Sequence, residues 1–73
     1  MKRQVKLGVF LAWLKKQGVT EAKKKGRGSH RMLEREGYRS VTMPDRREIP
    51  RFIVKKTCKQ LGLAPDDFWR DIE

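Results

Sequence analysis

The sequence has little cysteine and no long apolar run. Its 73 residues include one cysteine, Cys58, so an internal disulfide and a zinc site built from cysteines and histidines are both excluded. The longest apolar run, Val9 to Leu14, is six residues long, too short for a transmembrane helix or a signal peptide. We therefore expect a cytoplasmic protein that makes no membrane contact.

Acidic residues are also scarce, with 9 Asp and Glu against 19 Lys and Arg, which gives a net charge of +10. A chain this short has one thin core, which excludes a two-domain enzyme or a deep substrate cleft. The charge is uneven, because residues 65–73 carry a net −3 and residues 1–64 carry +13. We expect a basic domain over 1–63, an acidic C-terminal extension over 64–73, and an anionic partner.

Two stretches have the apolar spacing of helices. The first runs from Val5 to about Gln17 and stops at Gly18, and the second begins near Pro50 and ends before Gly62. On the first helix, a second apolar surface lies almost opposite the core-facing stripe and consists of Val5, Val9 and Trp13. The candidates to cover it are a partner protein or three residues of the acidic tail, Phe68, Trp69 and Ile72.

Two or three short strands are predicted between the helices, at about 19–25, 29–35 and 38–43, with glycine-containing turns between them. The first of these segments has poor strand propensity and is equally compatible with a helix. A short acidic helix or turn over about 66–72 ends the sequence. The order helix, strands, helix predicts an α+β fold, a small two-layer domain with an antiparallel sheet.

Cationic residues gather around the glycine turn at 26–28 and along one side of the second helix, where Phe52 stands among them. Clustering of this kind is typical of proteins that contact a phosphate backbone. The alternative is a solvated face, but solubility alone needs a net charge of only about 2–8. The candidate nucleic-acid-binding residues are Lys24, Lys25, Arg27, Gly28, Ser29, Arg31, Arg51, Lys55 and Lys59.

The single histidine, His30, directly follows Gly28 and Ser29. Glycines allow the backbone to approach a phosphate, and histidine can take up and release a proton near neutral pH. A histidine among cations is therefore equipped to act on a phosphodiester. Taken from the residues alone, a surface histidine without a catalytic role is the commoner case.

Other chemistries have less support in the sequence. Two-metal phosphodiester cleavage needs a cluster of carboxylates, and none stands near the glycine turn. Cys58 falls on the apolar half of its helix, which favours a core thiol over a nucleophile. We expect neither a metal nor another cofactor.

Several features in order resemble the HicA family of toxins over about residues 5–63. They are an amphipathic first helix that closes on Trp13–Gly18, then Gly28-Ser29-His30 on a turn, then Arg39–Pro44, then a helix from Glu48-Ile49 to Leu61-Gly62-Leu63. The sequence departs from the family at 45–46, where Asp-Arg stands in place of a frequent His-Pro pair, and in the tail beyond Leu63.

The resemblance implies a fold related to double-stranded-RNA-binding domains. It also implies a toxin that is a ribonuclease acting on messenger RNA and is inhibited by a HicB antitoxin, with His30 at the position of the catalytic histidine. We expect metal-independent cleavage by a ribose 2′-hydroxyl, with Lys25, Arg27 or Arg31 stabilising the phosphoryl charge. A non-catalytic RNA-binding module is the main alternative, and a helix-turn-helix DNA-binding regulator is a weaker one.

Overall fold

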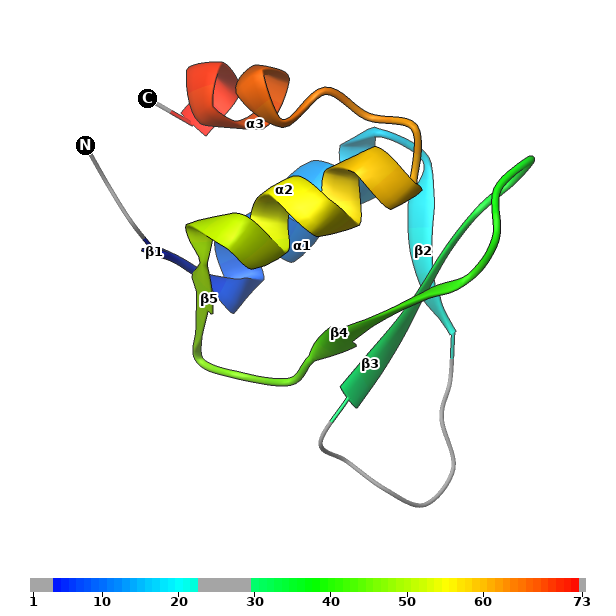
Figure 1. The fold of residues 1–73 in the computed structure, drawn as a ribbon, viewed down its shortest axis with the longest axis horizontal. Helices are drawn as coiled ribbons and strands as arrows, with labels where there is room; N and C mark the ends of the chain where they lie inside the picture. Colours follow the sequence, from blue (N-terminus) through cyan, green and yellow to red (C-terminus); the bar gives the residue numbers. More distant parts are fainter. Residues whose placement is uncertain (1–3, 23–29, 73) are drawn as a thin grey trace.

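The computed structural model describes residues 4–22 and 30–72, which form an α+β domain, as the sequence predicts. None of the helices in these residues has the length and hydrophobicity that crossing a membrane requires. In chain order (Figure 1), the elements are β1 (Gln4–Lys6), α1 (Leu7–Lys16), β2 (Val19–Ala22), β3 (His30–Arg35), β4 (Val41–Pro44), β5 (Glu48–Pro50), α2 (Arg51–Gln60) and α3 (Pro65–Ile72).

The main sheet is antiparallel and has the strand order β2-β3-β4. Its register places Leu33 on the central strand opposite Glu21 and Val41, and His30 opposite Pro44. Leu33 and Val41 are buried, so one face of the sheet packs on the core. The third strand begins at Val41, later than predicted, because residues 36–40 form a turn and its exit.

A second, two-stranded sheet was not predicted from the sequence. β1 and β5 pair antiparallel, with Val5 opposite Ile49, and both of these side chains are buried. The prediction that the first helix begins at Val5 is therefore wrong by two residues, because Val5 belongs to β1. Strands of three residues are too short to display an alternating pattern, so only the pairing reveals them.

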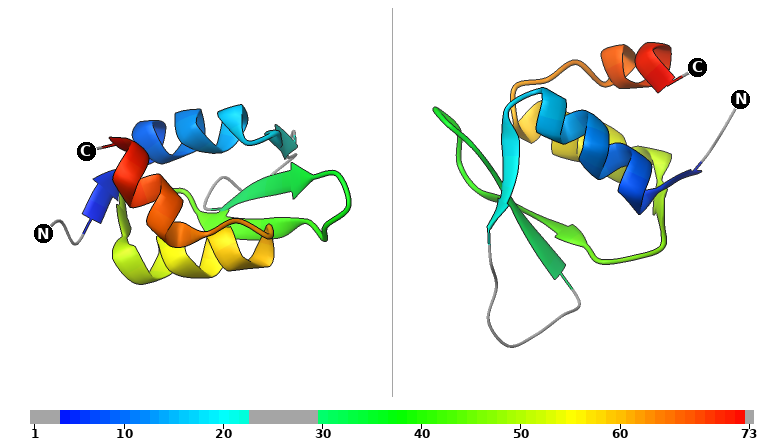
Figure 2. Two further views of the ribbon diagram at one scale, coloured as in Figure 1. Left: turned by 90° about the horizontal axis from the view of Figure 1, so that it is seen from above. Right: turned by 180° about the vertical axis from the view of Figure 1, so that it is seen from behind.

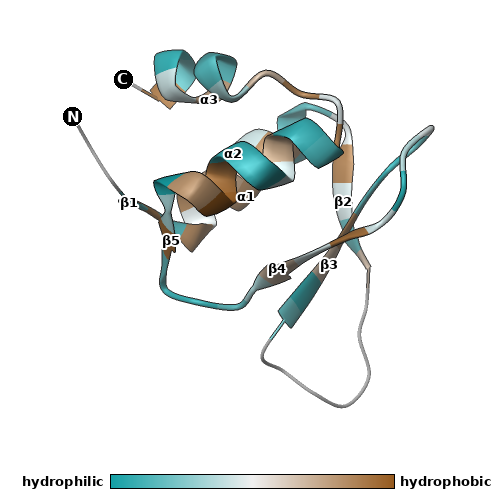
Figure 3. Ribbon diagram, in the orientation of Figure 1, coloured by the Kyte–Doolittle hydropathy of each residue, from teal (hydrophilic) through white to brown (hydrophobic). Residues whose placement is uncertain are grey.

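The core lies between α1, α2 and the inner face of the main sheet. Phe10 and Leu14 of α1 and Val54 and Cys58 of α2 are almost wholly buried there. Figure 3 shows the corresponding alternation of hydrophobic and hydrophilic bands along the helices. Each helix thus buries the apolar stripe that its sequence predicts.

The third helix lies across the α1–α2 pair, on the side opposite the segment that joins β4 to β5 (Figures 1 and 2). Its Phe68 is fully buried and makes edge-to-face contacts with Phe10, Trp13 and Trp69 at centroid distances of 5.0, 5.2 and 4.9 Å. Of the two candidates to cover Trp13, a partner protein or the acidic tail, the structure shows the tail in contact with it, while Val9 stays 42% exposed. The tail is therefore part of the core.

Candidate functional site

His30 is the first residue of β3 and is exposed. Side chains alternate between the two faces of a strand, so His30 shares the outer face of the sheet with Met32 and Glu34, opposite the buried Leu33. Figure 3 shows that β3 is hydrophilic at its beginning, next to the grey segment, and hydrophobic near its middle. The imidazole thus stands where a large substrate can reach it from solvent.

Five of the predicted binding residues lie outside the described residues, namely Lys24, Lys25, Arg27, Gly28 and Ser29. They occupy the segment that connects β2 to β3 and ends directly before His30. These five residues are therefore close to His30 in the sequence.

Arg31 is the neighbour of His30 that the structure describes, and it faces two carboxylates. Its Nε donates a hydrogen bond to Asp45 Oδ1 at 2.9 Å, and its Nη1 donates to Glu21. These hydrogen bonds, first the one to Asp45 and then the one to Glu21, raise the pKa of Arg31 above its ordinary value. Two carboxylates therefore balance the Arg31 charge. Through them, the Arg31 side chain links β3 to β2 and to Asp45, the residue that follows β4.

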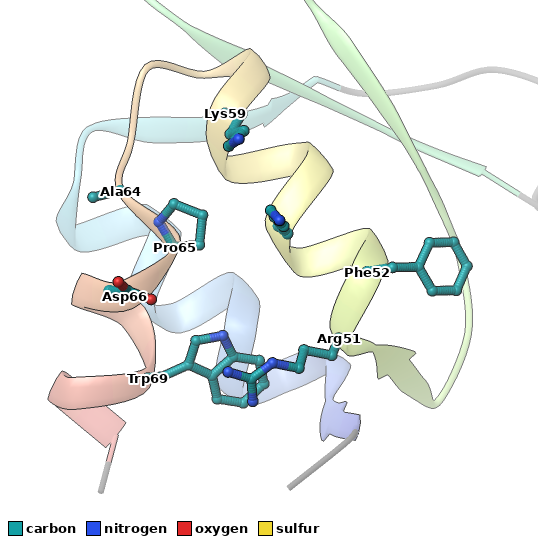
Figure 4. A pocket seen from close by; sticks show the side chains of 8 residues that line it. Arg51, Phe52, Lys59, Ala64, Pro65, Asp66 and Trp69 are labelled. Carbon is teal, nitrogen blue, oxygen red and sulfur yellow. The ribbon is translucent and has the colours of Figure 1, made fainter. Parts of the chain in front are cut away.

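The remaining predicted residues, Arg51, Lys55 and Lys59, come together in one groove between α2 and α3. The groove has a volume of about 620 Å³, and residues 64–66 and Trp69 form its other wall (Figure 4). The Arg51 guanidinium stacks on the Trp69 ring at 4.7 Å from its centroid. Neither His30 nor Arg31 is among the residues that line the groove, so the described candidate residues do not form one site.

Sequence reasoning missed the partners of these cations. Nothing in the local pattern around Arg31 points to Glu21 and Asp45, which are ten and fourteen residues away. Trp69 was one of several candidates to cover the first helix, and its stacking with Arg51 was not predicted.

Cys58 is a buried free thiol, as its position on the apolar half of the helix predicts. Burial raises its pKa to about 11, which keeps it protonated and unreactive near neutral pH. Among residues 4–22 and 30–72, no three His, Cys, Asp or Glu side chains are grouped as metal ligands would be.

Comparison with known families adds one finding. A family model described as HicA toxin of bacterial toxin-antitoxin matches residues 10–63, which is more than half of the chain. The match includes His30 and the cationic face of α2, and it ends before α3. No curated protein and no solved structure matches the chain.

Proposed function

We propose that this chain, which belongs to the HicA family of toxins from bacterial toxin–antitoxin systems, is an endoribonuclease that acts on messenger RNA. The observation that carries the proposal is the position of His30. It is the one histidine of the sequence, it lies within the matched region, and it is exposed at the start of β3. An exposed site suits a polymer that is held along a surface rather than enclosed in a cleft.

In the proposed reaction, His30 acts as general base or general acid. The ribose 2′-oxygen attacks the adjacent phosphorus and loses its proton, a bond forms between them, and the bond from phosphorus to the 5′-oxygen of the next nucleotide breaks. The leaving oxygen takes up a proton. The second proton transfer falls to Ser29, a lysine or water. No metal enters this scheme.

The charge that grows on the phosphoryl oxygens needs a nearby cation. The proposed residues are Lys25 or Arg27, which precede His30 in the chain, and Arg31, which follows it. Because Arg31 already bonds to Glu21 and Asp45, its charge is better placed to hold the strands beside His30 than to meet a phosphate unaided. We therefore rank Lys25 and Arg27 ahead of it.

The test is cleavage of a defined messenger RNA in EDTA by the wild-type chain and by His30→Ala and His30→Gln. We expect both variants to lose roughly 10²–10⁴-fold in rate while keeping RNA affinity. Mass spectrometry should find 2′,3′-cyclic phosphate ends, and RNA with a 2′-deoxy substitution at the cleaved position should stay intact. Undiminished cleavage by His30→Ala would remove His30 from the reaction. Intact RNA with tight wild-type binding would indicate a non-catalytic RNA-binding module.

Membership of the family also implies a cognate antitoxin, and we propose that a HicB antitoxin inhibits this chain by covering His30 with an acidic surface. Co-expression with the product of a neighbouring small gene should yield a stable complex that has lost RNA cleavage. A complex that still cleaves would contradict coverage of His30.

A further inference from the structure

The groove between α2 and α3 is strongly cationic on one side. Its lining contains Arg51, Lys55 and Lys59 against one carboxylate, Asp66. Both lysines are exposed, and within the described part of the chain neither makes an ion pair. Among the residues that the structure describes, no carboxylate therefore pairs with Lys55 or Lys59, and these two lysines give the groove its exposed positive charge.

The three cations are regularly spaced. They lie at i, i+4 and i+8 on one helix, so successive positions are about 6 Å apart along its axis. This step is close to the separation of neighbouring phosphates in a nucleic-acid strand. A strand that runs along α2 can thus meet successive cations with successive phosphates.

Arg51 lines the groove, and its guanidinium is positioned by stacking on the Trp69 ring. Trp69 is itself only 9% exposed and packs against the fully buried Phe68. The end of the stripe at Arg51 is therefore anchored to the core through α3. A preorganised cation loses less conformational entropy when it binds an anion.

Phe52 is the unusual residue of this surface, because its side chain is 68% exposed. It lies in the first turn of α2 among the cations, and Figure 4 shows its ring projecting away from Trp69, at the rim of the groove. Exposed aromatic rings beside a positive groove are the usual stacking platforms for unpaired bases. Bases in a duplex are already stacked on each other and cannot use such a ring.

From these observations we infer that the α2–α3 groove is a binding surface for single-stranded RNA, separate from His30. Phe52 stacks on an unpaired base, and Lys55 and Lys59 contact the flanking phosphates. The inference rests on the proposed function and specifies its substrate as single-stranded. Because the groove lining excludes His30, the groove contributes to binding and does not take part in the chemical step.

The binding test uses the His30→Ala chain, which prevents cleavage, with a short unstructured RNA and with a duplex of the same length. Phe52→Leu keeps an apolar side chain but removes the ring. It should weaken binding of the single strand roughly five- to hundredfold, the range that stacking of one base corresponds to, and leave duplex binding unchanged. Equal losses for both RNAs, or no loss, would overturn the inference.

The charge test compares two double variants that remove the same charge. Lys55→Gln/Lys59→Gln alters the groove, and Lys15→Gln/Lys16→Gln alters exposed lysines on α1. The groove variant should lower single-strand affinity more than tenfold and reduce the slope of log K against log salt by about 1.4, the value for two phosphate contacts. The α1 variant should change affinity less than threefold. Equal losses of affinity in the two double variants would mean that the groove attracts RNA only through the net charge of the domain, and this result would overturn the inference.

Kinetics separates this inference from the proposed nuclease activity. In the active chain, Phe52→Leu should raise KM and leave kcat unchanged. If the wild-type chain does not cleave RNA at all, the proposed function fails. The binding measurements still show whether the groove binds single-stranded RNA. If the groove variants bind RNA normally and instead fail to bind the cognate antitoxin, the groove is a protein-docking site and the inference is wrong.

Discussion

The indole Nε1 of Trp13 donates a hydrogen bond to Oδ2 of Asp71 at 2.9 Å and so joins α1 to α3 across 58 residues of sequence. Trp13 is only 6% exposed, and the ring of Phe68 packs against it. The Asp71 side chain is about half exposed, and one of its oxygens is the acceptor for this buried tryptophan. Without this acceptor, the indole N–H would be shielded from water and would lack a hydrogen bond, which costs free energy.

Asp71→Ala should destabilise the domain by about 1–3 kcal/mol, because the Trp13 N–H stays largely buried and loses its acceptor. Asp67→Ala is the matched control. It removes an exposed pair with Arg70, for which about 0–1 kcal/mol is expected. Urea denaturation measures both variants. Equal midpoints would show that the Trp13–Asp71 bond contributes no more than a surface ion pair.

Phe68→Ala should cost about 3–5 kcal/mol, because Phe68 is fully buried and touches three other aromatic rings. Domains of this kind have a total stability of about 5–15 kcal/mol, so we expect partial unfolding near 37 °C. Phe52→Ala provides the control, since it removes a ring that is 68% exposed and should change stability by less than about 0.5 kcal/mol. Thermal melts followed by near-ultraviolet circular dichroism distinguish the two. Similar melting temperatures would mean that α3 is not part of the core.

Arg31→Gln should destabilise the main sheet by roughly 1–2 kcal/mol, since it removes two partly exposed ion pairs that link β2, β3 and Asp45. The loss should shrink at high salt, which screens the pairs. Arg46→Gln, on an exposed residue of the same region, serves as the control for a change of one charge. If instead Arg31→Gln leaves stability unchanged and lowers RNA affinity more than Arg46→Gln does, Arg31 is a phosphate contact.

The Cys58 thiol should resist labelling by a maleimide at pH 8 in the folded chain and react rapidly in denaturant. Burial disfavours the thiolate and raises the pKa to about 11, above the value of about 8.5 for an unfolded cysteine. The contribution of the buried, protonated thiol to the free energy of unfolding is therefore complete below about pH 8.5 and is lost as the pH rises through about 11. Cys58→Ala should make stability less dependent on pH in this window. Rapid labelling of the folded chain would contradict the buried position.

Much of the fold follows from local patterns. The apolar stripe of α2 and the stop before Gly62 are visible in the sequence, and Gly62 does adopt a positive φ of 73°. The pairing of β1 with β5 is not visible, because each strand has only three residues and their contact depends on the whole domain. Strand boundaries near Val41 depend likewise on the turn before it.

The candidate site divides in the same way. His30 was predicted from its residue type, its glycine context and the family resemblance, and its exposure at a strand end was then found in the structure. The cationic stripe on α2 was predicted from periodicity. The opposite wall of the groove was not predicted, because Pro65 and Trp69 reach it only through the packing of α3.

The amino-acid sequence by itself determined the net charge of +10, the helical stripes and the family to which the chain belongs. These properties depend on composition, residue order and short-range spacing. Only the tertiary structure decided which charges are already engaged: Arg31 with two carboxylates, Arg51 with Trp69, and Asp71 with Trp13. The reason is that a long-range partner is set by strand register and helix packing, which no local pattern encodes.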